Sequence, residues 1–300
     1  MAQATTAGTV PTTRIVHRDK PLPLEYLRKR WLQAVLVLGF FFLYFPIVAL
    51  MATSFNEDKR NITWKGFTFD WYVKAYNDAS LFNALVNSLT VAFISTIVST
   101  LIGSMLGLAL YRYRFTGKAV FESTVFLPIV IPEISMAVAM LAYFAGIVMP
   151  MFTDLTGIEM SLNLFTITVS HIAFSFPFVA VVIVTRMAGF DESLEEASRD
   201  LGASAWQTFW NVTVPYMMPG VIAGALLAFT LSLDDFVITQ FTSGPGSTTL
   251  PIKIYSMVRF SVTPTVNAAS TVLIIITLTF AVAAMALQAR SDRNTVKKNG

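Results

Sequence analysis

The chain has 300 residues, of which 55% are hydrophobic and 13% charged, and its mean hydropathy is +0.63. This composition is too apolar for a soluble domain and predicts a protein that crosses a membrane several times. The chain has no cysteine, which excludes disulfides, thiolate metal sites and cysteine nucleophiles, and its two histidines leave little room for a metal site. The net charge of +3 gives no reason to expect a nucleic-acid partner.

The N-terminal segment, residues 1–31, is rich in Thr, Ala and Pro and then basic, without an apolar core. This pattern differs from that of a cleavable signal peptide and predicts a flexible cytoplasmic tail. We expect a transmembrane domain over residues 32–287 and a second cytoplasmic tail over residues 288–300.

Six apolar stretches are long enough to cross a bilayer as helices. They cover residues 32–55, 82–110, 120–149, 162–187, 216–241 and 266–287. Pro128, Pro132 and Pro177 interrupt the third and fourth stretches, and proline within a membrane helix usually marks a kink. The predicted fold class is therefore all-α, a polytopic membrane protein with six transmembrane helices.

The distribution of Lys and Arg predicts the orientation. Fifteen of the 21 lie before the first stretch, in residues 112–118, in residues 186–199 and at the C-terminal end. Because basic residues are retained on the cytoplasmic side, both termini and the loop after the fourth stretch are predicted to be cytoplasmic.

That loop, residues 191–215, is the longest polar interruption of the apolar pattern on this side. Residues 193–196 and 204–207 each fit a capping box, and Gly202 suits the left-handed residue that ends a helix. We expect two short helices joined at this glycine. Leu194, Ala197 and Leu201 share one face of the first helix, and charged residues occupy the rest.

The letters EEASRDLGA (residues 195–203) and VTVP (residues 212–215) resemble the EAA loop of bacterial ABC importer permeases. Glu196, Ala197, Gly202 and Pro215 fall at the matching places, Ser198 replaces the second Ala, and two valines replace Ile and Leu. The resemblance implies the ABC type I importer permease fold, with this loop as a coupling element in a groove of a cytoplasmic ATPase. The residues alone also allow an interfacial amphipathic loop.

No stretch matches G-x-x-x-x-G-K-[ST], the loop that cradles nucleotide phosphates. We therefore expect neither a cofactor nor catalysis in this chain, and an ABC system would need separate ATPase subunits to bind ATP.

Three acids lie within apolar stretches, where a charge costs about 2.5–3.5 kcal/mol on insertion scales. Asp234 and Asp235 follow Tyr216 by about 27 Å of helix, which predicts a position toward the outer mouth. Neighbours on a helix diverge by about 100°, so one of the two is expected to line a path while the other bonds to nearby groups. Glu133, about fourteen residues into the third stretch, is expected near mid-membrane, either in a cation path with these acids or in a helix–helix contact.

A few further residues are weighed for a role in a cation path. His171 is expected to be a hydrogen-bonded packing residue rather than a proton carrier. Four aromatic residues are candidate cation–π partners, although most Phe in such a chain face lipid or core: Phe229, Phe236, Tyr143 and Phe176.

From the first stretch to the last, the chain resembles the permeases of bacterial spermidine/putrescine importers. Residues 227–246 and LPIKIYSMVR (residues 250–259) carry the resemblance, which is to the second of two paired permease subunits. It implies import of polycations across the inner membrane by alternating access, with a homologous permease subunit, two ATPase subunits and a periplasmic binding protein as partners. An ABC permease for iron, thiamine or an opine, or an ion-coupled secondary transporter, stays open as an alternative.

Overall fold

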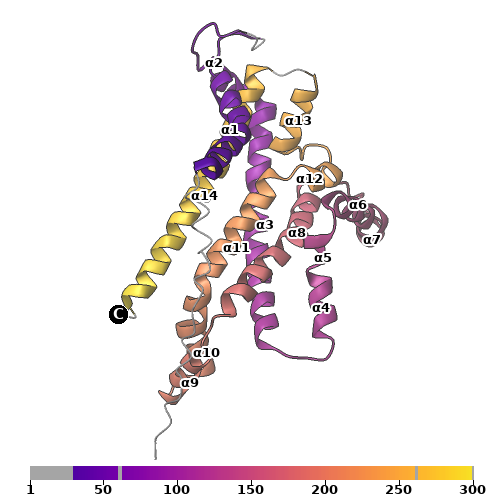
Figure 1. Cartoon of the computed structure of the whole chain (residues 1–300). Helices are drawn as coiled ribbons and strands as arrows, with labels where there is room; N and C mark the ends of the chain where they lie inside the picture. Colours follow the sequence, from indigo (N-terminus) through magenta and orange to yellow (C-terminus); the bar gives the residue numbers. More distant parts are fainter. Residues whose placement is uncertain (1–29, 60–62, 261–262, 299–300) are drawn as a thin grey trace, which may run out of the picture. The chain divides into compact units, whose positions relative to one another are not determined.

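The computed structural model describes residues 30–59, 63–260 and 263–298, so most of the predicted N-terminal tail lies outside the described residues. Within them, six helices are long and apolar enough to cross a membrane, which confirms the predicted all-α class (Figure 1). These helices are Arg30–Thr53, Ala79–Arg112, Glu133–Thr156, Leu164–Met187, Ala205–Asp234 and Pro264–Ala283.

The first of these helices, α1 (Arg30–Thr53), lies mostly in a unit of its own that ends at Leu50. The other helices belong to a second unit, which starts at Met51. Most apolar side chains of α1 are exposed, as expected for a helix that meets lipid or another protein chain.

The centre of the second unit is formed by α3 (Ala79–Arg112), α8 (Leu164–Met187) and α11 (Val214–Asp234). Glycines allow α3 and α8 to approach closely: a Cβ atom on Gly103 would lie 2.6 Å from the Cβ of Val179. Close approach through small residues is the usual way in which membrane helices associate, since lipid provides no hydrophobic drive between them.

The third predicted span, residues 120–149, is not one helix. It consists of α4 (Lys118–Val125), α5 (Leu127–Val130), α6 (Glu133–Tyr143) and a π-helical turn that continues into α7 (Met149–Thr156). Ile131 is extended with ψ 136°, because the ring of the following proline disfavours helical backbone at the preceding residue. Glu133 therefore starts a membrane-capable helix and does not lie about fourteen residues into one; its position near mid-membrane stays a prediction.

The fifth predicted span, residues 216–241, is wrong at both ends. The helix starts earlier, with α10 (Ala205–Thr208) and the π-helical turn η3 (Phe209–Thr213), and it stops at Asp234. Asp235 is extended, with ψ 126°, and the short helix α12 (Val237–Thr242) follows. The φ of Asp235, −61°, is still helical, so the chain changes direction after Asp235 and not between the two acids.

Four more helices complete the described chain. These are α2 (Asp70–Asn77), α9 (Ser193–Asp200), α13 (Leu250–Phe260) and α14 (Pro264–Lys298), and α2 packs against α14. The backbone of α14 stays helical through the described part of the predicted C-terminal tail. In Figure 1, α2 and α13 lie at the opposite end of α3 from α9 and α10.

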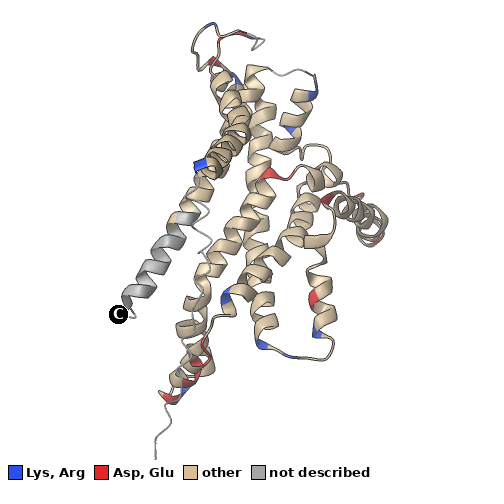
Figure 2. Ribbon diagram, in the orientation of Figure 1, with Lys and Arg blue, Asp and Glu red and all other residues tan. Residues whose placement is uncertain are grey.

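Charged residues of the second unit concentrate near the helix ends (Figure 2). The middle of the long helices is nearly free of them, as expected for segments that cross a bilayer. The acids at the end of α11 and at the start of α6, which the sequence had singled out, also lie at helix ends.

Candidate functional site

The polar loop at residues 191–215, called the coupling segment below, forms the two expected helices, α9 and α10. Gly202 joins them with φ +88°, the left-handed conformation predicted for it. Ser204 and Gln207 form the predicted capping box: the Ser204 side chain accepts from the Gln207 N–H, and the Gln207 side chain accepts from the Ser204 N–H. Pro215 is the second residue of α11 and follows the π-helical turn η3 directly.

The first predicted capping box, at residues 193–196, is absent. The N-cap of α9 is Glu192, whose side chain makes no capping hydrogen bond. Instead, the Asp191 carboxylate accepts the Ser193 N–H at 3.0 Å. The hydrogen bonds from the Ser193 hydroxyl and N–H hold the pKa of the exposed Asp191 carboxyl below its ordinary value.

The two faces of α9 are reversed relative to those of most amphipathic helices, which bury their apolar face and expose their charged face. The apolar face with Leu194, Ala197 and Leu201 is exposed, and the Leu201 side chain is 90% accessible. Glu195 points inward, with its side chain 12% exposed. An apolar face left open while a carboxylate is buried is typical of a surface that another protein covers.

Aromatic residues enlarge this exposed surface. Trp206 of α10 is 69% exposed and Trp210 of η3 is 50% exposed, and their ring centroids lie 5.6 Å apart. Glu196, the predicted coupling acid, is exposed on α9. The coupling segment therefore exposes apolar, aromatic and acidic side chains.

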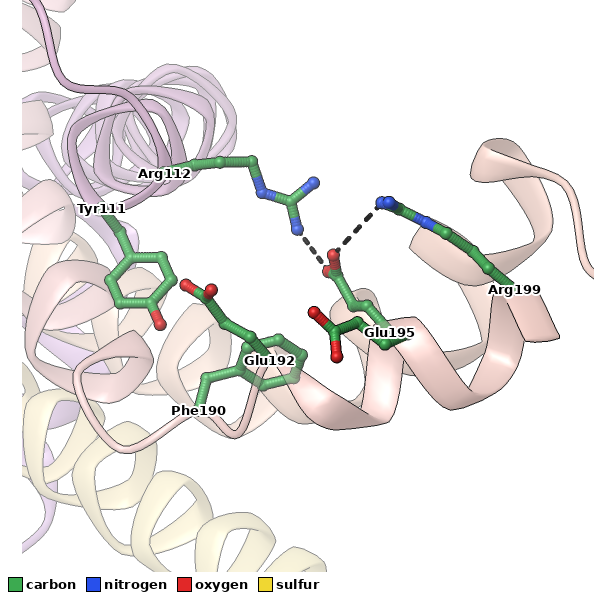
Figure 3. A pocket seen from close by; sticks show the side chains of 7 residues that line it. Tyr111, Arg112, Phe190, Glu192, Glu195 and Arg199 are labelled. Carbon is green, nitrogen blue, oxygen red and sulfur yellow. Dashed lines mark hydrogen bonds and ion pairs between the residues drawn. The ribbon is translucent and has the colours of Figure 1, made fainter.

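A cavity of about 260 Å³ lies between the end of α3 and the coupling segment (Figure 3). Within it, Arg112 forms an ion pair with Glu195, and Arg199 lies 3.7 Å from the second oxygen of the same carboxylate. Of the four predicted coupling residues, only Glu196 lines this cavity, whereas Ala197, Gly202 and Pro215 do not. Its lining residues are Tyr111, Arg112, Phe190, Glu192, Glu195, Glu196 and Arg199.

The second group of candidate residues lies at the break between α11 and α12. The Asp235 carboxylate accepts the N–H of Ile238 at 3.2 Å and the N–H of Thr239 at 2.8 Å, so it caps α12. The Thr239 hydroxyl donates to it at 2.6 Å. Asp235 is thus the acid that bonds to neighbouring groups, as the sequence predicted for one of the pair.

A buried hydrogen-bond chain leads from α3 to Asp235. The Ser95 hydroxyl donates to Ser232 Oγ at 3.0 Å, and Ser232 Oγ lies 2.7 Å from His171 Nδ1. His171 Nε2 faces Asp235 Oδ2. With the His171 proton on Nε2, Ser95, Ser232 and His171 each donate to the next group toward Asp235. His171 is therefore the hydrogen-bonded packing residue that the sequence predicted, but the sequence did not show its partner.

Glu133 and Asp235, about a hundred residues apart in sequence, are brought together. The Glu133 carboxyl group lies beside that of Asp235, and α6 packs against α12. Asp234 is exposed and lies in a groove beside α14, lined also by Leu273 and Thr277. Two carboxyl groups in contact repel when both are ionised, so this pair suits a cation.

The aromatic candidates are divided between core and surface. Phe229 is buried and stacks on Phe280 at 4.2 Å, and Phe176 lies beside the α3–α8 contact. Phe236 follows Asp235 and lies 4.6 Å from the Tyr255 ring. Tyr143 is half exposed on α6, the helix that starts with Glu133. Among the described residues, no cluster of three His, Cys, Asp or Glu could hold a metal ion.

Comparison with known proteins agrees with this architecture. The chain is 38% identical over 241 residues to the spermidine/putrescine transport system permease protein PotC of Haemophilus influenzae, covering 80% of this chain and 90% of that protein. It is 41% identical over 242 residues to PotC of Escherichia coli K12, covering 81% and 88%. It is also 36% identical over 275 residues to the putrescine transport system permease protein PotI of Escherichia coli K12, covering 91% and 96%.

Solved structures show the same fold. A chain of a bacterial ABC transporter involved in the import of the acidic polysaccharide alginate matches with a TM-score of 0.70 at 19% identity, covering 89% of this chain and 98% of that one. A chain of the MetNI methionine ABC transporter in an inward-facing conformation matches with a TM-score of 0.56 at 21% identity, covering 71% and 99%. The model of the family described as binding-protein-dependent transport system inner membrane component matches residues 99–297. This chain therefore belongs to that family, as a multi-pass permease component of the inner membrane.

Proposed function

We propose that this chain is one of two permease subunits of an ATP-driven importer of polyamines of the putrescine and spermidine class. The observation that carries the substrate class is the 36–41% identity to PotC and PotI over 80–91% of the chain. The buried acids fit such a cargo, because ammonium groups that leave water need carboxylates in its place.

Glu133 and Asp235 form the proposed cation site. Glu133 lies at the start of α6 and Asp235 at the break after α11, two places where the backbone departs from regular helix. Broken helices at such sites are common in transporters, because free backbone carbonyls and helix ends add ligands for a charged substrate. Asp234 faces the groove beside α14 and is a second acid along the route.

The coupling segment is the proposed docking element for a cytoplasmic ATPase subunit. Its support is the outward apolar face of α9, with Leu194 and Leu201, next to the exposed Glu196. Covering these side chains would stabilise the complex, since burial of apolar surface gives about 25 cal/mol per Å². Movement of the ATPase would then reach α8 and α11, which continue directly from the two ends of the coupling segment.

The remaining partners follow from this role. A homologous second permease subunit completes the pathway, a periplasmic binding protein delivers the substrate, and two ATPase subunits bind ATP, so the chain itself needs no cofactor and performs no catalysis. Both termini lie in the cytoplasm in this arrangement, in agreement with the concentration of Lys and Arg there.

Uptake of labelled putrescine and spermidine tests the proposal, in proteoliposomes that contain this chain, its partner permease, the ATPase and the binding protein. Glu133→Gln should lower uptake at least tenfold, whereas a matched acid-to-amide change at the exposed loop residue Glu159, Glu159→Gln, should leave it unchanged. Glu196→Lys should abolish uptake while the amount of protein in the membrane stays the same. ATP hydrolysis without movement of either amine would contradict the polyamine assignment but not the role as a permease.

A further inference from the structure

Glu195 occupies an unusual position in the coupling segment. Its carboxylate is largely buried on the inner face of α9, although most of this short helix is exposed. Oε1 accepts from both the Arg112 guanidinium and the hydroxyl of Thr213, which is fully buried in η3. One carboxylate thus joins three elements that are far apart in sequence: α3, α9 and η3.

Arg112 belongs to a two-point contact between α3 and the coupling segment. It is the last residue of α3, and the side chain of its neighbour Tyr111 lies beside that of Glu192, the N-cap of α9 (Figure 3). Glu192 and Glu195 are three residues apart and therefore lie on one side of the helix start. Two consecutive side chains of α3 thus face two acids of the coupling segment across one cavity.

This contact matters because α3 has no chain connection to the coupling segment. α8 leads into the segment and α11 leaves it, so both helices follow its movement through the backbone. α3 packs along both of these helices, with Gly103 and Gly107 against α8. For the three central helices to move as one body, α3 must also be held at its cytoplasmic end.

We propose that Glu195, paired with Arg112 and Thr213, is a positioning residue that fastens the coupling segment to α3, so that displacement of α9 moves α3 together with α8 and α11. This inference rests on the proposed coupling role of α9. Its physical basis is a charge-assisted hydrogen bond, which is stronger and more directional than a neutral one. Because Glu195 is largely buried, water and salt screen the pair less than a surface ion pair.

The first test measures transport efficiency, defined as substrate imported per ATP hydrolysed, in the complete reconstituted complex. Arg112→Ala should lower this ratio about tenfold while ATP hydrolysis continues, because α9 would then move without α3. Arg114→Ala is the matched control: Arg114 is exposed two residues after Arg112, outside the coupling segment, and forms no ion pair among the described residues, so the ratio should stay within about twofold of the wild type. An unchanged ratio in Arg112→Ala would overturn the proposal.

Charge exchange separates positioning from a general loss of folding. Arg112→Glu and Glu195→Arg should each lower the ratio about tenfold, and the double exchange should restore it to within about threefold of the wild type. A double variant no better than the single variants, in protein that still assembles with its partners, would contradict the pairing.

A second test needs no transported substrate. The chain has no cysteine, so Tyr113→Cys at the end of α3 and Asp200→Cys at the end of α9 give two unique spin-label sites in it. With wild-type Glu195, the distance between the labels should be the same without nucleotide and in the ATP-bound complex. In Glu195→Ala, the distance distribution should be at least twice as broad and should shift when ATP binds. If ATP binding shifts the distance between the labels in the wild type as it does in Glu195→Ala, Glu195 does not fasten the coupling segment to α3.

The two proposals can fail separately. If the wild-type complex hydrolyses ATP but imports no polyamine, the substrate assignment fails, and the spin-label distances still decide on Glu195. If polyamine is imported and the labels move independently in the wild type, the substrate assignment stands and the connection fails. If no ATPase subunit assembles on the chain, the coupling role fails and the connection fails with it.

Discussion

His171 Nε2 lies 3.1 Å from Asp235 Oδ2, and both side chains are only 2% exposed. The pair joins α8 to the break between α11 and α12, and Ser232 and Ser95 extend it to α3. A buried carboxylate in this position depends on its donors, since an unpaired charge away from water is costly. Asp235, which lies next to Glu133 in the proposed cation site, is therefore held in place by its hydrogen bond to His171.

His171→Ala should destabilise the protein by about 2–3 kcal/mol, because it removes one buried donor from the Asp235 carboxylate and leaves the Ser232 hydroxyl proton without its acceptor in the core. Thermal unfolding in detergent measures this loss. Ser99→Ala is the control on the same helix pair: its hydroxyl makes one long bond of 3.4 Å to the Ile172 carbonyl, so the effect should be under about 1 kcal/mol. Equal losses in the two variants would contradict the importance of the His171 chain.

Gly202→Ala should weaken attachment of the ATPase through backbone strain alone. The residue has φ +88°, and no atom lies within 4 Å of the place where its Cβ would stand. The left-handed backbone costs a residue with a Cβ about 1–2 kcal/mol. Co-purification of the ATPase subunit measures the effect. Gly202→Asn should retain more of the ATPase than Gly202→Ala, because Asn tolerates this conformation better, and the reverse order would contradict the role of φ.

Leu201→Ser should leave the free chain as stable as the wild type, since the side chain is already 90% exposed. It should weaken binding of the ATPase about tenfold if this leucine is covered in the complex. Titration of the ATPase subunit onto the detergent-solubilised permease measures the affinity. Tyr113→Ser, at an exposed residue after α3, is the control and should bind normally. Normal binding by Leu201→Ser would exclude this face of α9 from the interface.

Gly103→Ala should destabilise the α3–α8 contact by about 1–3 kcal/mol. The new methyl group would lie 2.6 Å from Val179 Cβ and 2.7 Å from the Phe176 carbonyl oxygen, so the helices must separate or bend. The unfolding temperature in detergent should fall. Gly146→Ala, where no atom lies within 4 Å of the new methyl group, should leave it unchanged or raise it. An unchanged unfolding temperature in Gly103→Ala would show that α3 and α8 can separate at little cost in free energy.

The number of membrane helices and the form of the coupling segment could be predicted from local sequence. Apolar length identifies helices that cross a membrane, because the bilayer forces the backbone to satisfy its own hydrogen bonds. Gly202 and the Ser204–Gln207 box act on their immediate neighbours, and both were predicted correctly. The predicted capping box at residues 193–196 was wrong. The Asp191 carboxylate accepts the Ser193 N–H, which the Glu196 side chain would accept in such a box.

The helix breaks were harder to predict, because apolar composition continues across them. Pro132 gave a local signal for the bend before α6. The break at Asp235 had no proline or glycine to mark it. It is stabilised by His171, Thr239 and the N–H of Ile238, the first of which is 64 residues away in the chain.

By itself, the sequence determined an all-α membrane protein with six spanning helices, a two-helix polar segment and three acids in apolar surroundings, because these depend on composition and short spacings. Only the tertiary structure decided that Glu133 meets Asp235 while Asp234 faces elsewhere, and that α9 turns Glu195 inward and Leu201 outward. The physical reason is that periodicity shows which residues share a helix face, whereas the partner of that face depends on Arg112, Thr213 and His171, which distant parts of the chain supply.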